Sequence, residues 1–409
     1  MKQFLPFVAL CPIILFADEY LQFADSAEQS EEVIQHPKIM VQSSSDNAQM
    51  DQMQQTVKTL QDKVAKLEKN QTKASGIPPS GRPEVKDGWN IFLMADLLYW
   101  KVEENGLEYA LKAKPDDLNS FLPVHGDIKA PDFDWHLGFK LGVGWNIPYD
   151  CWDLSLVWTR INADAHGRTE AGGGIIYGIF GDSPSSAVPC AKASADWSMH
   201  FNLLDLELGR EFYVGKHLTL RPHMGLRTAW IHQNYDVKYQ DVIGLGPLVT
   251  SVLFNKIDFH NHFDGIGVRG GCDSQWELGA GFSVFGNVAL SLLYGDIDVK
   301  RDRKQILNID TGGVQIGPVD VKGPIKSNVH VGRAALDFVL GLKWDYMLCH
   351  ERFHIGLEAG WEQHMFFGQN QLTNGVASEL FVISASEKYF TSNDDLTLQG
   401  LTVAGRFDF

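Results

Sequence analysis

The sequence predicts an all-β fold, a transmembrane antiparallel up-and-down β-barrel of 10–14 strands preceded by a short coiled-coil helix. Segments with one apolar and one polar face, at a period of two, recur along the chain and run to its last residue. The mean hydropathy of −0.14 and hydrophobic content of 44% are too low for a helical membrane protein. The 39 glycines, 24 phenylalanines and 11 tryptophans suit crowded lumen walls and aromatic belts.

The first 17 residues are expected to be a secretory signal peptide. Lys2 gives the positive start, residues 4–16 form an apolar run, and Ala17 supplies a short side chain before an acidic residue. A membrane helix is the alternative, but the run is well short of the ~20 residues that spanning requires. Leu15 is larger than the usual residue at that position, which leaves the cleavage site open by a few residues.

Three further segments precede the barrel. Residues 18–49 are acidic and lack periodicity, which predicts disorder. Residues 50–73 are expected to form a coiled-coil oligomerisation helix, because their apolar residues are spaced three and four apart. The seam consists of Met50, Met53, Val57, Leu60, Val64 and Leu67. We expect a homo-oligomer, with a trimer favoured, although such seams also form dimers and a lone amphipathic helix is the alternative. Residues 74–88 are a Pro/Gly linker.

Residues 89–409 are expected to form the barrel. The clearest strand covers residues 135–147, where large apolar residues alternate with glycine and polar residues. Trp135 and Trp145 lie at the two ends of its apolar face. At ~3.3 Å per residue and a tilt near 45°, that separation spans roughly 23 Å, close to the ~25 Å apolar band of an outer-membrane barrel.

Ten strong strands with alternating connections follow from the same pattern. The strands are 89–101, 135–147, 152–160, 199–213, 218–231, 274–284, 287–299, 333–345, 352–363 and 396–409. Short turns are expected near 148–150, 214–216, 285–286 and 347–350. Long loops are expected at 102–134, 162–197, 232–273, 300–331 and 364–395. Short periplasmic turns, long outer loops and an even strand count are typical of bacterial barrels and put both chain ends in the periplasm.

Two features leave details of this count open. A shift of parity near Leu203 and Leu204 predicts a β-bulge in the fourth strand. Weak strand patterns at 107–113, 235–239 and 379–384 extend strands or add pairs, which is why the expected count reaches 14.

The last strand carries a candidate assembly signal. Its apolar face presents Leu401, Val403, Phe407 and Phe409, and the chain stops on an aromatic residue. This ending resembles the C-terminal recognition signal of bacterial outer-membrane barrel proteins. The resemblance implies the barrel-assembly machinery and outer-membrane lipid as partners, and the bacterial outer membrane as the location. The alternative is the edge strand of a soluble β-sandwich.

The stretch FLMADLLYWKVEENGLEYA, residues 92–110, resembles the first barrel strand of the Legionella-type major outer-membrane protein family, which also occurs in chlamydia-like bacteria. The preceding heptad segment, the Gly-rich strand GFKLGVGW and the terminal phenylalanine agree with it. That family is described as pore-forming, so the resemblance implies a porin. It supplies no catalytic residues.

Charged residues on the polar strand faces are expected to point into the lumen, because charges facing lipid are unfavourable. The candidates are Lys140, Asp153, Asp205, Glu207, Arg221, Arg227, Glu277, Arg333, Asp337, Lys343, Arg352 and Glu358. One hypothesis is that some of them line a constriction and set selectivity. The other is that they pair in a network that plugs a narrow barrel, which is at least as plausible for ten strands.

Four cysteines follow the signal peptide, in an exported and therefore oxidising setting. Cys151 and Cys349 are expected in periplasmic turns, and Cys190 and Cys272 in outer loops. Pairing within each side, free thiols and disulfide-linked neighbours all remain open. The resemblance to proteins of chlamydia-like bacteria prompts the last of these.

Other motifs are weak. The net charge of −16 disfavours nucleic acid as a partner. Gly265, Gly267 and Gly270 spell a dinucleotide-binding pattern without the strand–helix context that it needs. His260 and His262 lie in an expected outer loop without a further metal ligand at convincing spacing, so we expect no metal and no cofactor.

The sequence therefore predicts a porin that passes ions and small hydrophilic solutes across a Gram-negative outer membrane by passive diffusion. The alternative is a closed-barrel structural or adhesive surface protein that acts through its outer loops. A barrel enzyme is a third class, but spacing gives no reason to unite His232, Asp236 and His260 at one rim. We expect no enzymatic activity.

Overall fold

The computed structural model describes Lys58 and residues 79–113, 125–172, 174–180, 188–243, 249–311, 314–378, 386–391 and 394–409. The chain divides into two compact units, residues 1–77 and 78–409, and the second contains the barrel. The expected signal peptide, acidic segment and coiled-coil seam, Met53 to Leu67, lie outside the described residues and stay predictions.

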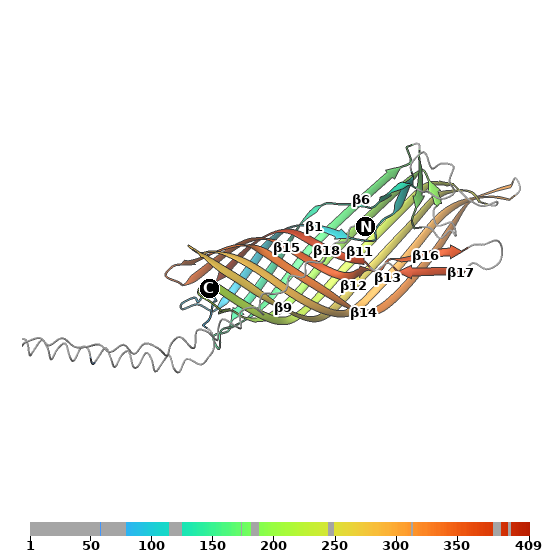
Figure 1. The fold of residues 1–409 in the computed structure, drawn as a ribbon. Helices are drawn as coiled ribbons and strands as arrows, with labels where there is room; N and C mark the ends of the chain where they lie inside the picture. The colour runs from blue at the N-terminus through green and yellow to red at the C-terminus, as the bar shows by residue number, and fades with distance from the viewer. Residues whose placement is uncertain are drawn as a thin grey trace, which may run out of the picture. The chain divides into compact units, whose positions relative to one another are not determined.

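Ten long strands form a closed antiparallel barrel in the described part of the chain (Figure 1). They are β1 (Ile91–Glu104), β5 (Trp135–Asn146), β6 (Trp152–Glu170), β9 (Lys192–Arg210), β11 (Leu218–Ile243), β12 (Val249–Gly279), β13 (Phe282–Thr311), β14 (Val314–Leu348), β15 (Phe353–Asn370) and β18 (Asp394–Asp408). Each pairs with its neighbours, and β18 pairs with β1 over 13 residue pairs, which closes the ring. The expected all-β barrel is confirmed, at the lower bound of its strand count.

Shorter strands complete the described sheets. β4 (Asp132–Phe133) and β10 (Phe212–Tyr213) add to the barrel sheet. β2 (Ala110–Ala113), β3 (Gly126–Lys129), β7 (Ile175–Gly178) and β8 (Val188–Cys190) form a separate four-stranded sheet, here called the small sheet. β16 (Thr373–Ser378) and β17 (Ser386–Thr391) form a hairpin.

The outward face of the barrel carries an exposed apolar belt between two aromatic bands. At the end with the short turns, here called the turn end, the band includes Trp145, Trp152, Trp276 and Phe282. At the other end, here called the outer end, it includes Tyr99, Trp135, Trp230, Tyr294 and Trp361. The rings of Tyr99 and Trp135 stack at 5.1 Å. Large apolar side chains so exposed, flanked by aromatic rings, are typical of a barrel surface in contact with lipid.

The candidate assembly signal lies on this lipid-facing surface. Leu401, Val403 and Phe407 are 45%, 47% and 38% exposed, respectively. The ring of Phe409 lies 5.8 Å from that of Phe407 and 6.4 Å from that of Trp89. The last strand therefore presents the apolar face that the sequence predicts. Among the described residues, no helix has the length and apolar character needed to cross a membrane.

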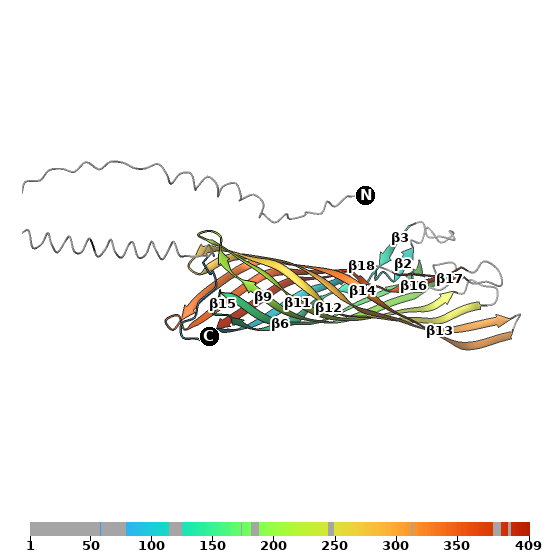
Figure 2. The same ribbon diagram turned by 90° about the horizontal axis from the view of Figure 1, so that it is seen from below.

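Two of the expected long loops are instead extensions of the barrel strands. β11 and β12 continue through much of 232–273, and β13 and β14 through much of 300–331, so four strands extend far beyond the apolar belt (Figure 2). Beyond the belt the pattern is reversed. Inward residues such as Tyr235, Val237 and Phe259 are buried, and the outward residues are polar. Because the apolar residues face inward here, the lipid-facing alternation used to predict the strands stops at the end of the belt.

Two finer predictions were wrong. The third turn lies at Gly279, Ala280 and Gly281, which all have positive φ, rather than at 285–286. The residues on both sides of this turn keep the same parity, so the apolar pattern continues through the reversal. No bulge occurs at Leu203 and Leu204, because β9 pairs with β6 and β11 without a register shift there. Leu203 is simply an apolar residue that faces the interior.

The interior near the outer end is filled with apolar side chains, here called the apolar layer. The rings of Phe201 on β9 and Phe366 on β15 meet at 5.5 Å. Four strands separate β9 from β15 on either side of the ring, so this contact crosses the barrel at its widest. Beyond it the small sheet is attached to the wall, where the hydroxyl groups of Tyr235 and Tyr239 donate to the carbonyl oxygens of Leu107 and Tyr109 at 2.6 and 2.7 Å.

The segment before β1 runs along the turn end of the barrel. The amide of Tyr213 donates to the carbonyl oxygen of Pro79 at 3.1 Å, and the Arg82 guanidinium donates to the carbonyl oxygen of Trp152 at 2.9 Å. The amide of Lys86 donates to the carbonyl oxygen of Glu351 at 2.8 Å. The described part of the predicted linker is thus fixed to three separate turns.

Tight packing between strands leaves no room for a side chain at several glycines, and Gly267 is an example. A Cβ atom added at Gly267 would lie 1.9 Å from the carbonyl oxygen of Leu292, whereas one added at Gly332 would meet nothing within 4 Å. We predict that Gly267→Ala lowers the free energy of unfolding by about 1–3 kcal/mol, the usual effect of overpacking. Gly332→Ala should stay close to wild type. Denaturant unfolding in detergent micelles measures both, and equal stability of the two variants would contradict the prediction.

Candidate functional site in the barrel lumen

The candidate site is a cavity of about 280 Å³ in the lumen, between the turn end and the apolar layer. Every second residue of the strands points into it, as the alternation requires. Both charge signs line it, with arginine and lysine side chains facing carboxylates from other strands. We call these residues the lumen network.

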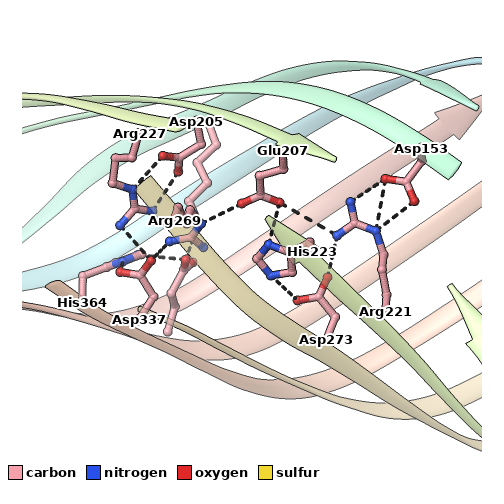
Figure 3. A network of polar contacts seen from close by, with 12 residues as sticks. Asp153, Asp205, Glu207, Arg221, His223, Arg227, Arg269, Asp273, Asp337 and His364 are labelled. Atoms are coloured by element: carbon pink, nitrogen blue, oxygen red, sulfur yellow. Dashed lines mark hydrogen bonds and ion pairs between the residues drawn. The ribbon is translucent and has the colours of Figure 1, made fainter. Parts of the chain in front are cut away.

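One half of the lumen network is centred on Asp337 (Figure 3). Arg227 binds Asp205 through two parallel hydrogen bonds of 2.7 and 2.8 Å, and its third nitrogen lies 2.8 Å from Asp337. Arg269 pairs with the same Asp337 and, through Nε, with Glu207 at 2.7 Å. Bidentate arginine–carboxylate pairs are among the stronger polar contacts in proteins and fix the orientation of both groups.

The other half is centred on Arg221. Its Nε donates to Asp153 at 3.0 Å, and its Nη1 donates to Asp273 at 2.7 Å. His223 lies between Glu207 and Asp273, at 3.6 and 3.5 Å from their carboxylate oxygens. Glu207 is therefore within reach of both halves, and a continuous polar chain runs from Asp153 to Asp337 (Figure 3).

A second connection crosses the lumen from β5 to β15. Lys140 pairs with Glu362, although β1 and β18 lie between their strands. Glu362 also accepts a hydrogen bond of 2.7 Å from the Thr402 hydroxyl, which in turn accepts one of 3.0 Å from the Trp100 indole. The remaining contact is a 2.9 Å hydrogen bond between Glu362 and His364. Such hydrogen-bonded chains hold together strands that are not neighbours in the sheet.

Closer to the turn end lies a further group of charges. His354 contacts Asp345 at 2.9 Å and Asp408 at 2.7 Å. Asp408 also accepts a hydrogen bond of 2.7 Å from Arg406 on the same strand. Lys343 lies 3.3 Å from Glu358. These contacts place the polar face of the last strand beside its neighbour β15.

Exposure varies among the lumen charges, and His354 and Asp408 near the turn end are almost fully buried. The side chains of Glu358 and Asp273 are 29% and 27% exposed, whereas those of Asp337 and Arg227 are 4% and 1% exposed. Glu358 and Asp273 are therefore partly accessible to water, whereas Asp337 and Arg227, next to the apolar layer, are not. The arrangement is a charged chamber on the turn-end side of the apolar layer.

Most of the predicted lumen residues line this chamber. They are Lys140, Asp153, Asp205, Glu207, Arg221, Arg227, Asp337, Lys343 and Glu358. Glu277 lies at the rim, where it accepts a 2.9 Å hydrogen bond from the Tyr213 hydroxyl. Arg333 lies beyond the apolar layer, on the extended part of β14. Arg352 is a correction, because it is exposed in the turn between β14 and β15 and faces no lumen.

Several lumen residues escaped the sequence search. Arg269 fell in a region expected to be a loop, and His364 lay just past the predicted end of its strand. Asp273 was missed for the same reason as Arg269. Arg406 and Asp408 were visible on the polar face of the last strand, and alternation alone would have found them. The period of two continues past the lipid-facing residues, and this pattern could have identified the missed positions.

The remaining motifs also lie on strands. Gly265, Gly267, Gly270, His260 and His262 all belong to β12 rather than to a loop. Cys151 and Cys349 lie in turns at the turn end, as expected, and Cys190 belongs to the small sheet. Cys272 is a correction, because it lies on β12 opposite the lipid-facing Val288 and not in an outer loop.

Residues 81–409 match the protein family described as "Legionella pneumophila major outer membrane protein precursor". This chain belongs to that family. Members of the Legionella major outer-membrane protein family are outer-membrane proteins, which together with the barrel places the chain in the outer membrane. A search of curated proteins finds no match.

Solved structures of other barrel proteins share little sequence with this chain. The Escherichia coli outer-membrane protease OmpT has 10% identity and a TM-score of 0.35, with 81% of this chain and 100% of that chain covered. A Pseudomonas aeruginosa FadL homologue has 8% identity and a TM-score of 0.24, with coverages of 83% and 96%. The Pseudomonas putida toluene transporter TodX has 10% identity and a TM-score of 0.23, with coverages of 79% and 90%. We draw no functional conclusion from these likenesses.

The lumen network predicts a large stability effect at its centre. Arg227→Met would leave Asp205 and Asp337 buried with one cation fewer, and breaking a buried ion pair in this way costs about 3–5 kcal/mol. Arg352→Met, the matched control in the exposed turn, should change stability by less than about 0.5 kcal/mol. Unfolding of the refolded protein in lipid vesicles compares them. Similar values for the two variants would mean that the network is not structural.

Proposed function

We propose that the protein is an outer-membrane pore for ions and small hydrophilic solutes. The observation that carries this proposal is the charged chamber, which lies inside the membrane-crossing part of a closed barrel and is partly accessible to water. A barrel that served only as an anchor could be filled with apolar side chains. Charged groups of both signs, partly hydrated, suit the passage of small polar solutes.

The apolar layer is the proposed gate. Phe201 and Phe366 meet across the barrel directly beyond Arg227 and Asp337, and no backbone segment lies between the two rings in the residues described. Apolar constrictions of this kind close channels by excluding water, and small movements of the side chains reopen them. The gate is thus formed by wall residues, with the small sheet behind it.

A closed surface protein is the second candidate, and the small sheet favours it. Three tyrosines, Tyr109, Tyr235 and Tyr239, are buried there and bonded to neighbouring segments. A permanently fixed small sheet would keep the barrel shut and leave the extended outer strands as the working surface.

Single-channel recording in planar bilayers separates the two candidates. We predict discrete openings of the wild-type protein and larger or longer openings of Phe201→Ala/Phe366→Ala, because removing both rings widens the constriction. Phe338→Ala, on the lipid-facing side, is the matched control and should leave conductance unchanged. A silent wild type with a conducting double variant would support the closed surface protein. Heat-modifiable migration on gels confirms folding in each case.

Charge in the chamber should set ion selectivity. Arg221→Ala removes the cation that faces Asp153 and Asp273, so we predict a shift of the reversal potential towards cation selectivity in a salt gradient. Arg333→Ala, beyond the apolar layer, tests whether the outer part of the path also contributes. Unchanged conductance and selectivity in both variants would remove the two arginines from the conduction path.

We further propose export through residues 1–17, recognition of the last strand by the barrel-assembly machinery, and a homotrimer held by residues 50–73. Support comes from the sequence patterns and, for the last strand, from the outward position of its apolar residues. Chemical cross-linking of the full chain, compared with a variant lacking residues 50–73, tests the trimer. A cross-linked trimer band for the full chain that is absent for the variant would support the proposed trimer.

A further inference from the structure

A row of polar side chains follows the outward face of six adjacent strands just beyond the outer aromatic band. The members are paired directly from strand to strand, so their side chains lie side by side. In order from β6 to β14 they are Asn162, His200, His232, His262, Asp298 and Asn328. Three neighbouring imidazoles at the centre of this row are here called the histidine row.

The depth of the histidine row is set by the aromatic band. His232 follows the lipid-facing Trp230 by two residues, and Asp298, the partner of His262, follows Tyr294 by four. At ~3.3 Å per residue and a tilt near 45°, the row lies roughly 5–10 Å beyond the band. Aromatic belts mark the headgroup level of a membrane, so the row faces the phosphate region of the outer leaflet.

The imidazoles contact one another and polar neighbours. The rings of His232 and His262 stack at 4.6 Å. His200 Nδ1 lies 3.0 Å from the Asn162 amide oxygen, and His232 Nε2 lies 2.8 Å from an Asp264 oxygen. His232 is 40% exposed, so it is accessible from the surrounding medium.

Mixed charges surround the row on every strand. They are Arg160, Asp164 and His166 on β6; Asp196 on β9; Asp236 and Lys238 on β11; Asp258, His260 and Asp264 on β12; Asp296, Lys300 and Asp302 on β13; and Lys326 and His330 on β14. Carboxylates outnumber arginine and lysine among these neighbours, so the surface around the row repels anions. Imidazolium charges on the row would reduce this repulsion.

Protonation would place like charges side by side in the row, where Asp264 and Asp298 are the two carboxylates that face His232 and His262. Like charges directly opposite each other on adjacent strands are destabilising. Burial, followed by the neighbouring imidazoles of His232 and His260, lowers the pKa of His262, which lies beyond the membrane-crossing part of β12. When folding lowers the pKa of a histidine, the folded protein loses stability as the pH falls through the ordinary pKa range of histidine. An anion bound to the row would offset this loss of stability, so that acidification would stabilise the folded protein instead.

We propose that His200, His232 and His262 bind the phosphate groups of outer-leaflet lipids, and that acidification strengthens this contact. An imidazolium donates a charge-assisted hydrogen bond to a phosphate oxygen. Three such donors on adjacent strands, at headgroup depth, match a layer of lipid phosphates better than a single solute. The proposal concerns the outer surface and does not rest on conduction through the lumen.

The test is the thermal midpoint of the full chain in lipid vesicles. Vesicles of phosphatidylcholine alone are compared with vesicles in which a fifth of the lipid is phosphatidic acid, at about pH 5.5 and about pH 7.5, on either side of the ordinary pKa of histidine. We expect phosphatidic acid to raise the midpoint by roughly 3 °C or more at the lower pH, and by clearly less at the higher pH. His200→Asn/His232→Asn/His262→Asn should lose the acid-specific rise.

Controls keep the proposal falsifiable. His350→Asn, in an exposed turn at the other end of the barrel, should behave as wild type. If the triple variant does not fold, as judged by heat-modifiable migration, His232→Asn alone should show a reduced rise. An equal rise in the variants, or a rise independent of pH, would overturn the proposal. A similar rise caused by inorganic phosphate in phosphatidylcholine vesicles would identify free phosphate, rather than lipid, as the ligand.

Discussion

Closure of the barrel by pairing β18 with β1 is the constraint on which the rest of the structure depends. In lipid, each backbone N–H and C=O group needs a partner within the protein, and an open sheet edge would leave a row of them unpaired. The 13 residue pairs between the first and last strands remove that edge. They also fix the parity of every strand, because one residue of slip would turn an apolar face to the lumen.

A ring of ten strands is narrow, so the interior must be packed. The charged half satisfies its groups by pairing between neighbouring strands, as Arg227 does with Asp205, and between strands that are not neighbours, as Arg227 does with Asp337. In the apolar half, Phe201 and Phe366 from opposite strands contact each other at the centre of the barrel. Pairing compensates much of the desolvation of buried charges, and the apolar contact excludes water. One geometry thus provides both a hydrated chamber and its closure.

The barrel strands β11 to β14 continue beyond the lipid-facing belt. Beyond Trp230 and Tyr294 the outward residues become polar, while inward residues such as Tyr235 and Phe259 stay buried. The same period of two therefore serves two different surroundings along one strand. This change brings six outward-facing polar residues, including His200, His232 and His262, into one row at the edge of the lipid.

The sequence by itself determined the ten strands, their order, the lipid-facing residues and most lumen charges, because a period of two and the exclusion of charge from lipid are local rules. It missed the strand extensions because their apolar side faces inward, and it misplaced the third turn because parity continues through Gly279–Gly281. Only the tertiary structure decided which charges pair across the lumen and that Phe201 meets Phe366, since those contacts join strands that are not neighbours in the sheet. Distances across a closed ring depend on strand number and stagger together, and no single segment contains that information.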